Sequence, residues 1–183
     1  MIEIRTARTA LRVLDPKWSD SLLRYRMRNK EHLSPWEPKR DRTYYTEASS
    51  KERLEKDCEG FTSGHSICLW GVDATASDII GSCNFSNIVW GPFQACHLGF
   101  SVDANYQGKG YMKEMLEAAI GYVFGTVGLH RVMANHMPSN TRSAKLLEGL
   151  GFEKEGFARS YLQINGRWED HVLTAMVNPD HRT

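Results

Sequence analysis

The sequence predicts one α+β domain in which a mixed, mostly antiparallel sheet is flanked by helices. The chain of 183 residues is long enough for one hydrophobic core and short for two. Three strand-like runs, residues 66–72, 79–88 and 95–102, follow one another with turn residues between them. A long segment of helical period, residues 109–127, comes directly after the third run. We therefore expect a layered domain over residues 1–183.

The N-terminal part is expected to hold one extended segment and two helices. Apolar and polar side chains alternate over residues 10–14, and Asp15-Pro16 then breaks the pattern. Helices are predicted over residues 19–30 and 46–61. Between them, Trp36 stands in a stiff loop bounded by two prolines. This order places an aromatic loop between two helices.

The middle and C-terminal parts continue with turns, strands and one more helix. Turns are predicted over residues 73–78 and 90–92, and strands over residues 131–137, 152–164 and 167–176. Asn165-Gly166 between two alternating runs is a strong hairpin signal. A helix should begin near Asn140, for which Ser139 or Asn140 is a suitable N-cap, and Gly151 should end it.

Composition excludes several classes of protein. Lys and Arg number 23 against 22 Asp and Glu, so no global charge favours DNA or a membrane as partner. Neither an N-terminal signal segment nor a run of about 18 apolar residues is found. The four cysteines lie far apart without a C-x-x-C pair, which indicates free thiols and no metal site. We expect a cytoplasmic protein, either a monomer or a weak dimer.

The segment from Gln107 to Met112 has the features of an anion site. It lies at a predicted junction between a strand and a helix, and it contains Gly108 and Gly110. Glycines let the main chain approach a ligand, and the first turn of a helix offers unpaired N–H groups that favour a diphosphate. The spacing fits neither a P-loop nor a dinucleotide fingerprint. A plain helix-capping turn is the alternative reading.

This segment resembles motif A of the GNAT superfamily of N-acetyltransferases, Gln/Arg-x-x-Gly-x-Gly/Ala, whose amides hold the pyrophosphate of acetyl-CoA. Gln107 and Gly110 match, whereas Met112 stands where Gly or Ala is usual. The order of elements is also that of the GNAT fold, so the resemblance covers nearly the whole chain. It implies two splayed strands that form the CoA slot, here residues 95–102 and 131–137.

A second segment, from Asn140 to Phe152, resembles the N-x-x-S/A…L-G-F motif of the same superfamily. The resemblance implies that Asn140 bonds the pantetheine amide and that a main-chain N–H at or near Phe100 stabilises the oxyanion. The Tyr that often protonates the leaving thiolate is replaced by Leu147, so Ser143 becomes the candidate acid; capping or packing is its other reading. The residues thus expected to bind acetyl-CoA are Phe100, Ser101, Val102, Gln107, Gly108, Lys109, Gly110, Tyr111, Met112, Asn140 and Ser143.

Residues 29–46 and 165–175 closely resemble the ribosomal-protein-alanine N-acetyltransferases of the RimJ type, which acetylate the N-terminal alanine of the fifth protein of the small ribosomal subunit. The acceptor implied is the N-terminus of a ribosomal protein, which could be met on the assembling ribosome. The alternatives are a small-amine acetyltransferase, acting on a polyamine or an aminoglycoside, and a CoA-binding domain without activity.

The acceptor side should include an aromatic platform of Trp36 and Tyr44, although Trp36 could equally pack the loop. The acids expected to attract a protonated N-terminus are Glu31, Glu37 and Asp41. The titratable groups to inspect first for a base are His97, Asp170 and His171. The basic residues Arg24, Arg26, Arg28 and Lys30 could face RNA or form a solvated helix face.

Overall fold

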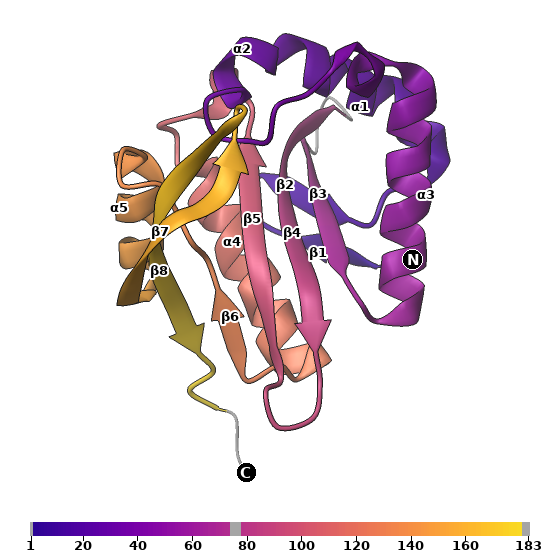
Figure 1. Cartoon of the computed structure of the whole chain (residues 1–183). Helices are drawn as coiled ribbons and strands as arrows, with labels where there is room; N and C mark the ends of the chain where they lie inside the picture. The colour runs from indigo at the N-terminus through magenta and orange to yellow at the C-terminus, as the bar shows by residue number, and fades with distance from the viewer. Residues whose placement is uncertain (1, 74–77, 181–183) are drawn as a thin grey trace.

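The computed structural model describes residues 2–73 and 78–180, and within them one continuous sheet of eight strands runs in the order β1-β2-β3-β4-β5-β6-β8-β7 (Figure 1). The strands are β1 Glu3–Arg5, β2 Thr9–Arg12, β3 Ile67–Asp73, β4 Ile79–Val89, β5 Ala95–Val102, β6 Arg131–Met133, β7 Glu153–Ile164 and β8 Arg167–Val177. Only the β5–β6 pair is parallel among the paired strands described. The predicted mixed, mostly antiparallel sheet is confirmed.

Helices cover both faces of the sheet. They are α1 Ser19–Arg28, α2 Lys30–Leu33, α3 Glu47–Ser63, α4 Tyr111–Tyr122 and α5 Thr141–Leu150, joined by the 3-10 turns η1 Pro16–Trp18, η2 Arg42–Tyr45 and η3 Ala104–Tyr106 and the π segment η4 Val123–Val127. One hydrophobic cluster unites α4 with one sheet face through Met115 and Leu116, and a second unites α1 and α3 with the other face through Leu22 and Leu54. Figure 1 shows α4 behind the strands and α3 beside β3, at the right of the view.

Local sequence signals placed many of the boundaries correctly. Thr46 caps α3 by accepting a hydrogen bond from Ser49 N at 3.2 Å. Asn140 caps α5 in the same way through Ser143 N, and Gly151 ends that helix with a φ of 95°. The hairpin between β7 and β8 turns at Asn165-Gly166, with both φ angles positive. Of the turn predicted over residues 73–78, residues 74–77 lie outside the described part of the chain.

Several predicted elements are divided or shortened. The N-terminal segment is two strands, because Thr6 N bonds Thr9 O and turns the chain. The helix predicted over residues 19–30 ends at Arg28, where the buried side chain of Asn29 donates to the carbonyl of Tyr25. The strand predicted over residues 131–137 ends at Met133 and continues only as an isolated bridge between His136 and Val172.

The prediction that Arg26 faces solvent or RNA was wrong. Arg26 is 5% exposed, and its guanidinium donates to the carbonyl of Tyr44 at 3.0 Å and to Ser50 Oγ at 3.1 Å. Its guanidinium also lies 4.0 Å from the centre of the Tyr44 ring. Arg28 pairs with Asp103 and with Asp78, so it too serves the fold. A basic repeat on a helix therefore holds α1 to its neighbours.

The structure shows neither a membrane-spanning helix nor a metal-binding cluster within the residues it describes. No described helix combines the length and apolar character needed to cross a bilayer. No group of three or more His, Cys, Asp or Glu side chains in residues 2–73 and 78–180 could hold a metal ion. All four cysteines are free thiols, as the sequence predicted, and burial raises the pKa of Cys96 to about 12.

Asp103 joins the end of β5 to the end of α1. Its carboxylate accepts hydrogen bonds from Arg28 Nε, from Asn29 Nδ2 at 2.9 Å and from Asn105 N at 2.9 Å. Asn29 Oδ1 also accepts from Ala104 N at 2.9 Å. Burial alone would raise the pKa of Asp103, but the bonds from Arg28 and Asn29 hold the pKa below its usual range.

We predict that Asp103→Asn lowers the free energy of unfolding by about 1–3 kcal/mol at pH 7, because the charged hydrogen bond to Arg28 is lost. The folded-state pKa is depressed, so this contribution is present above the unfolded value of about 3.9 and is lost as the pH falls below it. Urea unfolding at pH 7 and pH 3 measures both effects. The control Asp20→Asn removes an exposed pair with Arg24 and should cost less than about 0.5 kcal/mol. A difference that persists unchanged at pH 3 would contradict this account.

Candidate active site

The site begins where strands β5 and β6 separate. They pair only from Ala95 to His97 on β5 and from Arg131 to Met133 on β6. Beyond this point β5 continues to Val102 paired with β4 alone, while the chain after β6 pairs with β8 through His136. The edge of β5 from Leu98 onward therefore faces an opening in the middle of the sheet, as the resemblance implied.

Backbone groups of β5 point alternately toward β4 and toward this opening. Asp103 N donates to Ile80 O, so the backbone N–H and C=O groups of the odd-numbered residues of β5 face β4. The carbonyl of Val102 instead accepts from His32 Nε2 at 3.2 Å, away from β4. Phe100 lies two residues before Val102 on the same strand, so its backbone groups face the same way. Its N–H is therefore directed into the opening. This is the position in which an oxyanion could be bound.

Ser101 does not reach the opening. Its backbone faces β4, and its hydroxyl lies 2.8 Å from Tyr25 Oη and 3.0 Å from Ser82 Oγ. Both of its polar groups are thus engaged by α1 and the sheet. Of the three β5 residues expected to bind the cofactor, Phe100 and Val102 present backbone groups to the opening and Ser101 does not.

The glycine turn directs unpaired amides toward the same end of the sheet. Gly108 and Gly110 have φ angles of 69° and 80°, which L side chains rarely adopt. Gly110 is the N-cap of α4, and no side chain caps the helix there. The first N–H groups of α4, from Tyr111 onward, are left for another partner by helix geometry. An anion is the natural partner for this helix end.

Met112 departs from the usual motif, and its side chain is directed into the core. It is 7% exposed and belongs to the cluster that unites α4 with the sheet. Only its backbone N–H is therefore available to a ligand. The departure leaves the turn intact, because a side chain at this position points away from the site.

Arg8 holds the glycine turn from the N-terminal strands. Its Nη1 donates to the carbonyl of Lys109 at 2.9 Å, and its Nε pairs with Glu114 at 2.7 Å. The guanidinium also lies 4.0 Å from the centre of the Tyr111 ring. Partial burial alone would raise the pKa of Glu114, but hydrogen bonds from Thr6 and Arg8 lower that pKa. Arg8 could not be singled out from the sequence, because its contact with Lys109 joins residues that are far apart in the chain.

Gln107 connects the turn to α5 across the opening. Its Oε1 accepts a hydrogen bond from Arg142 Nη1 at 2.6 Å, and its Nε2 lies 3.1 Å from His32 Nε2. Arg142 is exposed in the first turn of α5, so it adds a positive charge beside the uncapped start of α4. The contact of Arg142 with Gln107 joins residues 35 positions apart, so the sequence alone does not indicate it. The two helix starts and this guanidinium converge on one place.

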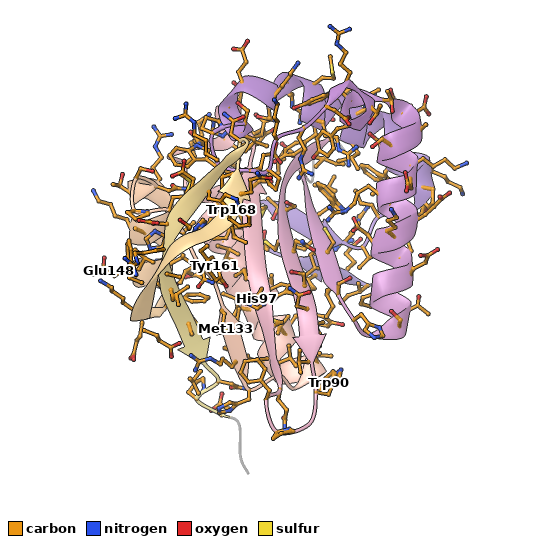
Figure 2. The ribbon with its side chains drawn as sticks, viewed as in Figure 1. Trp90, His97, Met133, Glu148, Tyr161 and Trp168 are labelled. Carbon is orange, nitrogen blue, oxygen red and sulfur yellow. The ribbon has the colours of Figure 1, made fainter. Side chains whose placement is uncertain are left out.

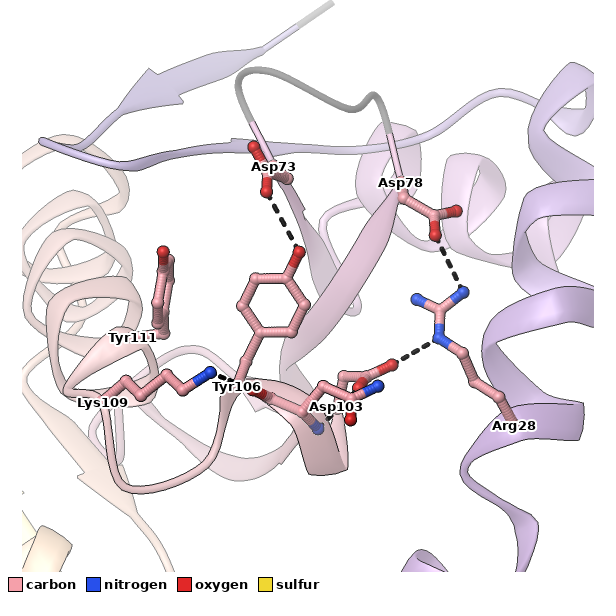
Figure 3. A pocket seen from close by; sticks show the side chains of 8 residues that line it. Arg28, Asp73, Asp78, Asp103, Tyr106, Lys109 and Tyr111 are labelled. Atoms are coloured by element: carbon pink, nitrogen blue, oxygen red, sulfur yellow. Dashed lines mark hydrogen bonds and ion pairs between the residues drawn. The ribbon is translucent and has the colours of Figure 1, made fainter.

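A polar hollow of about 490 Å³ lies beside the turn (Figure 3). It is lined by Arg28, Asp73, Asp78, Asp103, Asn105, Tyr106, Lys109 and Tyr111. Tyr106 Oη donates to Asp73 at 3.0 Å, and Lys109 Nζ donates to the carbonyl of Asn105 at 2.8 Å. The polar groups of this hollow bond one another, so they support the turn. Lys109 can therefore offer a ligand its amide while its ammonium is engaged.

A cleft of about 150 Å³ occupies the opening between β5 and β6. Its lining residues are Trp36, Leu98, Gly99, Phe100, Asn135, His136, Met137, Asn140, Ser143 and His171. Asn140 Oδ1 is used to cap α5, whereas its Nδ2 has no protein partner among the described residues. The half-buried Ser143 lies one turn away. The cleft thus unites the Phe100 amide, a free amide donor and a hydroxyl.

Only part of the predicted acceptor platform is present at the cleft. Trp36 lines the cleft and is 41% exposed, and the backbone of Glu37 accepts from Asn165 N of the β7–β8 turn at 2.9 Å. Tyr44 is not a platform, because its ring is stacked with Arg26 and with the Arg40 guanidinium at 4.4 Å. The pairing of Tyr44 with arginines on other elements could not be read from the sequence.

Two of the three acids expected to attract a protonated N-terminus, Asp41 and Glu37, have local partners. Asp41 caps the 3-10 turn η2 by accepting from Thr43 N at 2.9 Å and Tyr44 N at 3.2 Å. Glu37 pairs with Arg40 at 3.3 Å. Both carboxylates lie in the stretch beside the cleft, but neither lines it. We therefore assign them to the structure of the loop.

Of the three titratable groups singled out from the sequence, His171 alone lines the cleft. Asp170 accepts from Ser160 N at 2.8 Å and supports the β7 bulge. His97 lies on β5, and its Nδ1 is buried without a hydrogen-bond partner in the described structure. Figure 2 labels His97 together with Met133, Tyr161 and Trp168. The structure thus places one of the three candidate groups in the lining of the cleft and the other two outside it.

Comparison with known proteins identifies the same architecture. Residues 8–153 match the acetyltransferase (GNAT) domain family. The chain is 44% identical over 179 residues to ribosomal protein uS5-alanine N-acetyltransferase of Escherichia coli K12, covering 98% of this chain and 92% of that protein. It also matches the structure of ribosomal-protein-S5-alanine acetyltransferase from Vibrio fischeri, with a TM-score of 0.95, 39% identity and 100% coverage of both chains. Mycobacterium smegmatis RimJ in complex with CoA-disulfide has the same fold, with a TM-score of 0.91, 24% identity and coverage of 100% of this chain and 90% of that one.

We predict that Gly110→Pro weakens CoA binding by about tenfold or more, because proline excludes the φ of 80° and removes one amide donor. Isothermal titration with CoA measures the affinity, and circular dichroism checks the fold. The matched control is Gly128→Pro, which replaces a glycine of φ 82° at the far end of the α4 segment. Both variants should lose stability, but only the first should lose affinity. Equal affinities for the two variants would be inconsistent with this binding site.

Proposed function

Because the chain belongs to the GNAT acetyltransferase family, we propose that it transfers the acetyl group of acetyl-CoA to the α-amine of the N-terminal alanine of ribosomal protein uS5. The observation that carries this proposal is the similarity, over 98% of the chain, to an enzyme that acts on that alanine. A cytoplasmic location agrees with such an acceptor. The cleft, the glycine turn and the chemistry of the amine each support it.

The donor side of the proposed site lies on the α4 and α5 side of the sheet. The amides from Gln107 to Met112 and the start of α4 would hold the pyrophosphate of acetyl-CoA, because they are uncapped and open. Arg142 would add charge beside them. Asn140 Nδ2 would donate to a carbonyl of the pantetheine arm, since its Oδ1 is already used for capping.

Acyl transfer needs stabilisation of the oxyanion that forms on the thioester carbonyl. The Phe100 N–H is directed into the opening and is available for this task. Ser143 has its backbone N–H in the α5 cap, while its Oγ has no protein partner in the described structure. We assign to Ser143 the protonation of the departing CoA thiolate. Leu147, at the position where relatives often carry a tyrosine, is buried in the core and cannot replace it.

The amine chemistry favours an N-terminal acceptor over lysine. An α-amino group has a pKa of about 7.7–8.0, whereas a lysine has one of about 10.4. At neutral pH, the α-amine is therefore about two orders of magnitude richer in its neutral, nucleophilic form. The residues that line the cleft include no Asp or Glu among those described, so nothing acidic there favours a polycation. The same observation disfavours a polyamine as acceptor.

We predict that uS5, or a peptide that begins with alanine, is acetylated at its α-amine at least about 100-fold faster than the same peptide with that amine blocked and an internal lysine free. Spermidine should react more slowly than the alanine peptide. Thiol release from acetyl-CoA, with mass spectrometry of the product, measures the three rates. Preference for spermidine or lysine would refute the proposed acceptor while leaving the fold and the donor site in place, and no thiol release with any amine would favour a non-catalytic domain.

We predict that Ser143→Ala lowers kcat by about tenfold or more with little change in the KM for acetyl-CoA, because a proton donor acts in the transition state. Asn140→Ala is the contrasting variant: it should raise that KM and also destabilise α5 by about 1 kcal/mol, since it removes the N-cap. Steady-state and single-turnover kinetics measure these parameters. An unchanged rate of the chemical step in Ser143→Ala would return this serine to a structural role.

A further inference from the structure

The proposed function leaves open which group removes a proton from the attacking amine. The α-ammonium that predominates at neutral pH must lose one proton before its nitrogen can attack. Among the described residues that line the cleft, the side chains able to accept that proton near pH 7 are the histidines His136 and His171. Resting on the proposed function, we infer that His171 is the general base, whose Nε2 takes this proton.

The hydrogen bonding of His171 leaves the correct nitrogen basic. Its Nδ1 lies 3.0 Å from the carbonyl oxygen of Glu169. A carbonyl oxygen only accepts, so Nδ1 carries the hydrogen and the neutral ring has its lone pair on Nε2. No group in the described part of the chain bonds Nε2. The nitrogen that can accept a proton is therefore the one without a protein partner.

The ring of His171 is held in place by its neighbours. The residue is 4% exposed, and its ring centre lies 5.5 Å from that of Tyr161. Tyr161 Oη accepts from Asn135 Nδ2 at 3.2 Å, and Asn135 Oδ1 accepts from Thr174 N at 3.2 Å. The imidazole is thus packed against a side chain that is itself anchored to β8. A base must be positioned in this way to act efficiently.

His171 and His136 lie on opposite faces of the sheet. Side chains alternate along a strand, and directly paired residues share a face. Val132 and Ala134 are packed in the cluster that contains α4. His136 lies two residues further along the same chain, so its side chain is on the face of the sheet that α4 covers. His136 pairs with Val172, which places the adjacent His171 on the other face.

The face of His171 is the one from which an acceptor can reach the cleft. The glycine turn and the starts of α4 and α5 form the proposed donor site on the face of the sheet that α4 covers. Gly99 lies on the opposite face of β5, and an added Cβ there would meet nothing within 4 Å. The acceptor amine therefore approaches past Gly99 and His171, while the thioester arrives from the side of His136.

Few charges surround the imidazole. The titratable groups near it are Tyr161 on β7, His136 across the cleft, and Glu169, which lies two residues before it on the same face of β8. Strand β5 and helix α5 present only uncharged side chains to the cleft, and the loop before η2 presents Trp36.

With His171 as the base, every proton that is transferred in the reaction has a donor and an acceptor. His171 Nε2 takes one proton from the ammonium, and the amine nitrogen then forms the C–N bond to the thioester carbon. The nitrogen of the tetrahedral species loses a second proton to solvent as the amide forms, and Ser143 regains from solvent the proton that it passes to the thiolate. The C–S bond breaks, and the thiolate gains one proton through Ser143. His171 returns its proton to water, so the net products are the acetylated amine, CoA thiol and one released proton.

The test is the ratio of parent to variant kcat measured from pH 7 to pH 9.5 in single-turnover experiments. The variant is His171→Asn, because the asparagine amide can still donate to the Glu169 carbonyl while the basic nitrogen is removed. The expected ratio is about tenfold or more at pH 7 and falls toward one by pH 9.5, where the amine arrives already neutral. A ratio that stays the same at every pH would show a structural role and overturn the proposal.

The matched control is His136→Asn, whose imidazole also donates from Nδ1 to a carbonyl, that of Met137 at 3.0 Å. The ratio of parent to His136→Asn kcat should not vary with pH. If this ratio varied with pH while that of His171→Asn did not, the general base would be His136 instead of His171. The ratio is measured on whichever amine the parent enzyme acetylates, so failure of the alanine assignment leaves this test in force. Nitrogen-15 NMR of the resting enzyme at pH 8 gives a second readout. An unprotonated Nε2 on His171 is expected, and a hydrogen on Nε2 would overturn the proposal.

Discussion

The early separation of β5 from β6 is the constraint on which the rest of the site depends. Three residues of each strand pair, and the two chains then take different partners, β4 on one side and β8 on the other. If the pairing had continued, the backbone N–H and C=O groups along this edge of β5 would have bonded to β6. Because the ladder stops, the Phe100 N–H remains unpaired by β6 and is directed into the opening.

The opening is useful only because its rim is fixed by contacts between distant parts of the chain. Asp103 ties the end of β5 to Arg28 and Asn29 on the first helical segment. Arg8 ties the glycine turn to the N-terminal strands through Lys109. The turn therefore keeps two glycines in left-handed conformations and leaves the start of α4 uncapped. Such pre-formed backbone donors can bind an anion without reorganising.

The sequence predicted the features that depend on a few neighbouring residues. The caps of α3 and α5, the Asn165-Gly166 turn and the glycine turn all follow from local conformational preferences. Asn140 and Ser143 were found for the same reason, because their motif opens a helix beside the cleft. The strand order around the opening was available only through resemblance to a family.

The features that the sequence did not predict arise from contacts between distant residues. Arg26 looks solvated in a basic repeat, yet Tyr44 and Ser50 from elsewhere in the chain bury it. Ser101 looks like a cofactor ligand by its place on β5, yet Tyr25 of α1 engages its hydroxyl. His171 could be singled out as a titratable residue, but its place on one face of the cleft depends on how β6 and β8 align.

We propose that donor and acceptor enter one opening from opposite faces of the sheet. A conjugate that joins the sulfur of CoA, through an acetyl carbon, to the α-nitrogen of an alanine-initiated peptide would span both entrances. The most direct measurement is the dissociation constant of this conjugate by titration calorimetry. Our account predicts binding at least about 100-fold tighter than CoA alone, because the linked halves occupy adjoining sites at high effective concentration. Binding no tighter than that of CoA would contradict a shared opening.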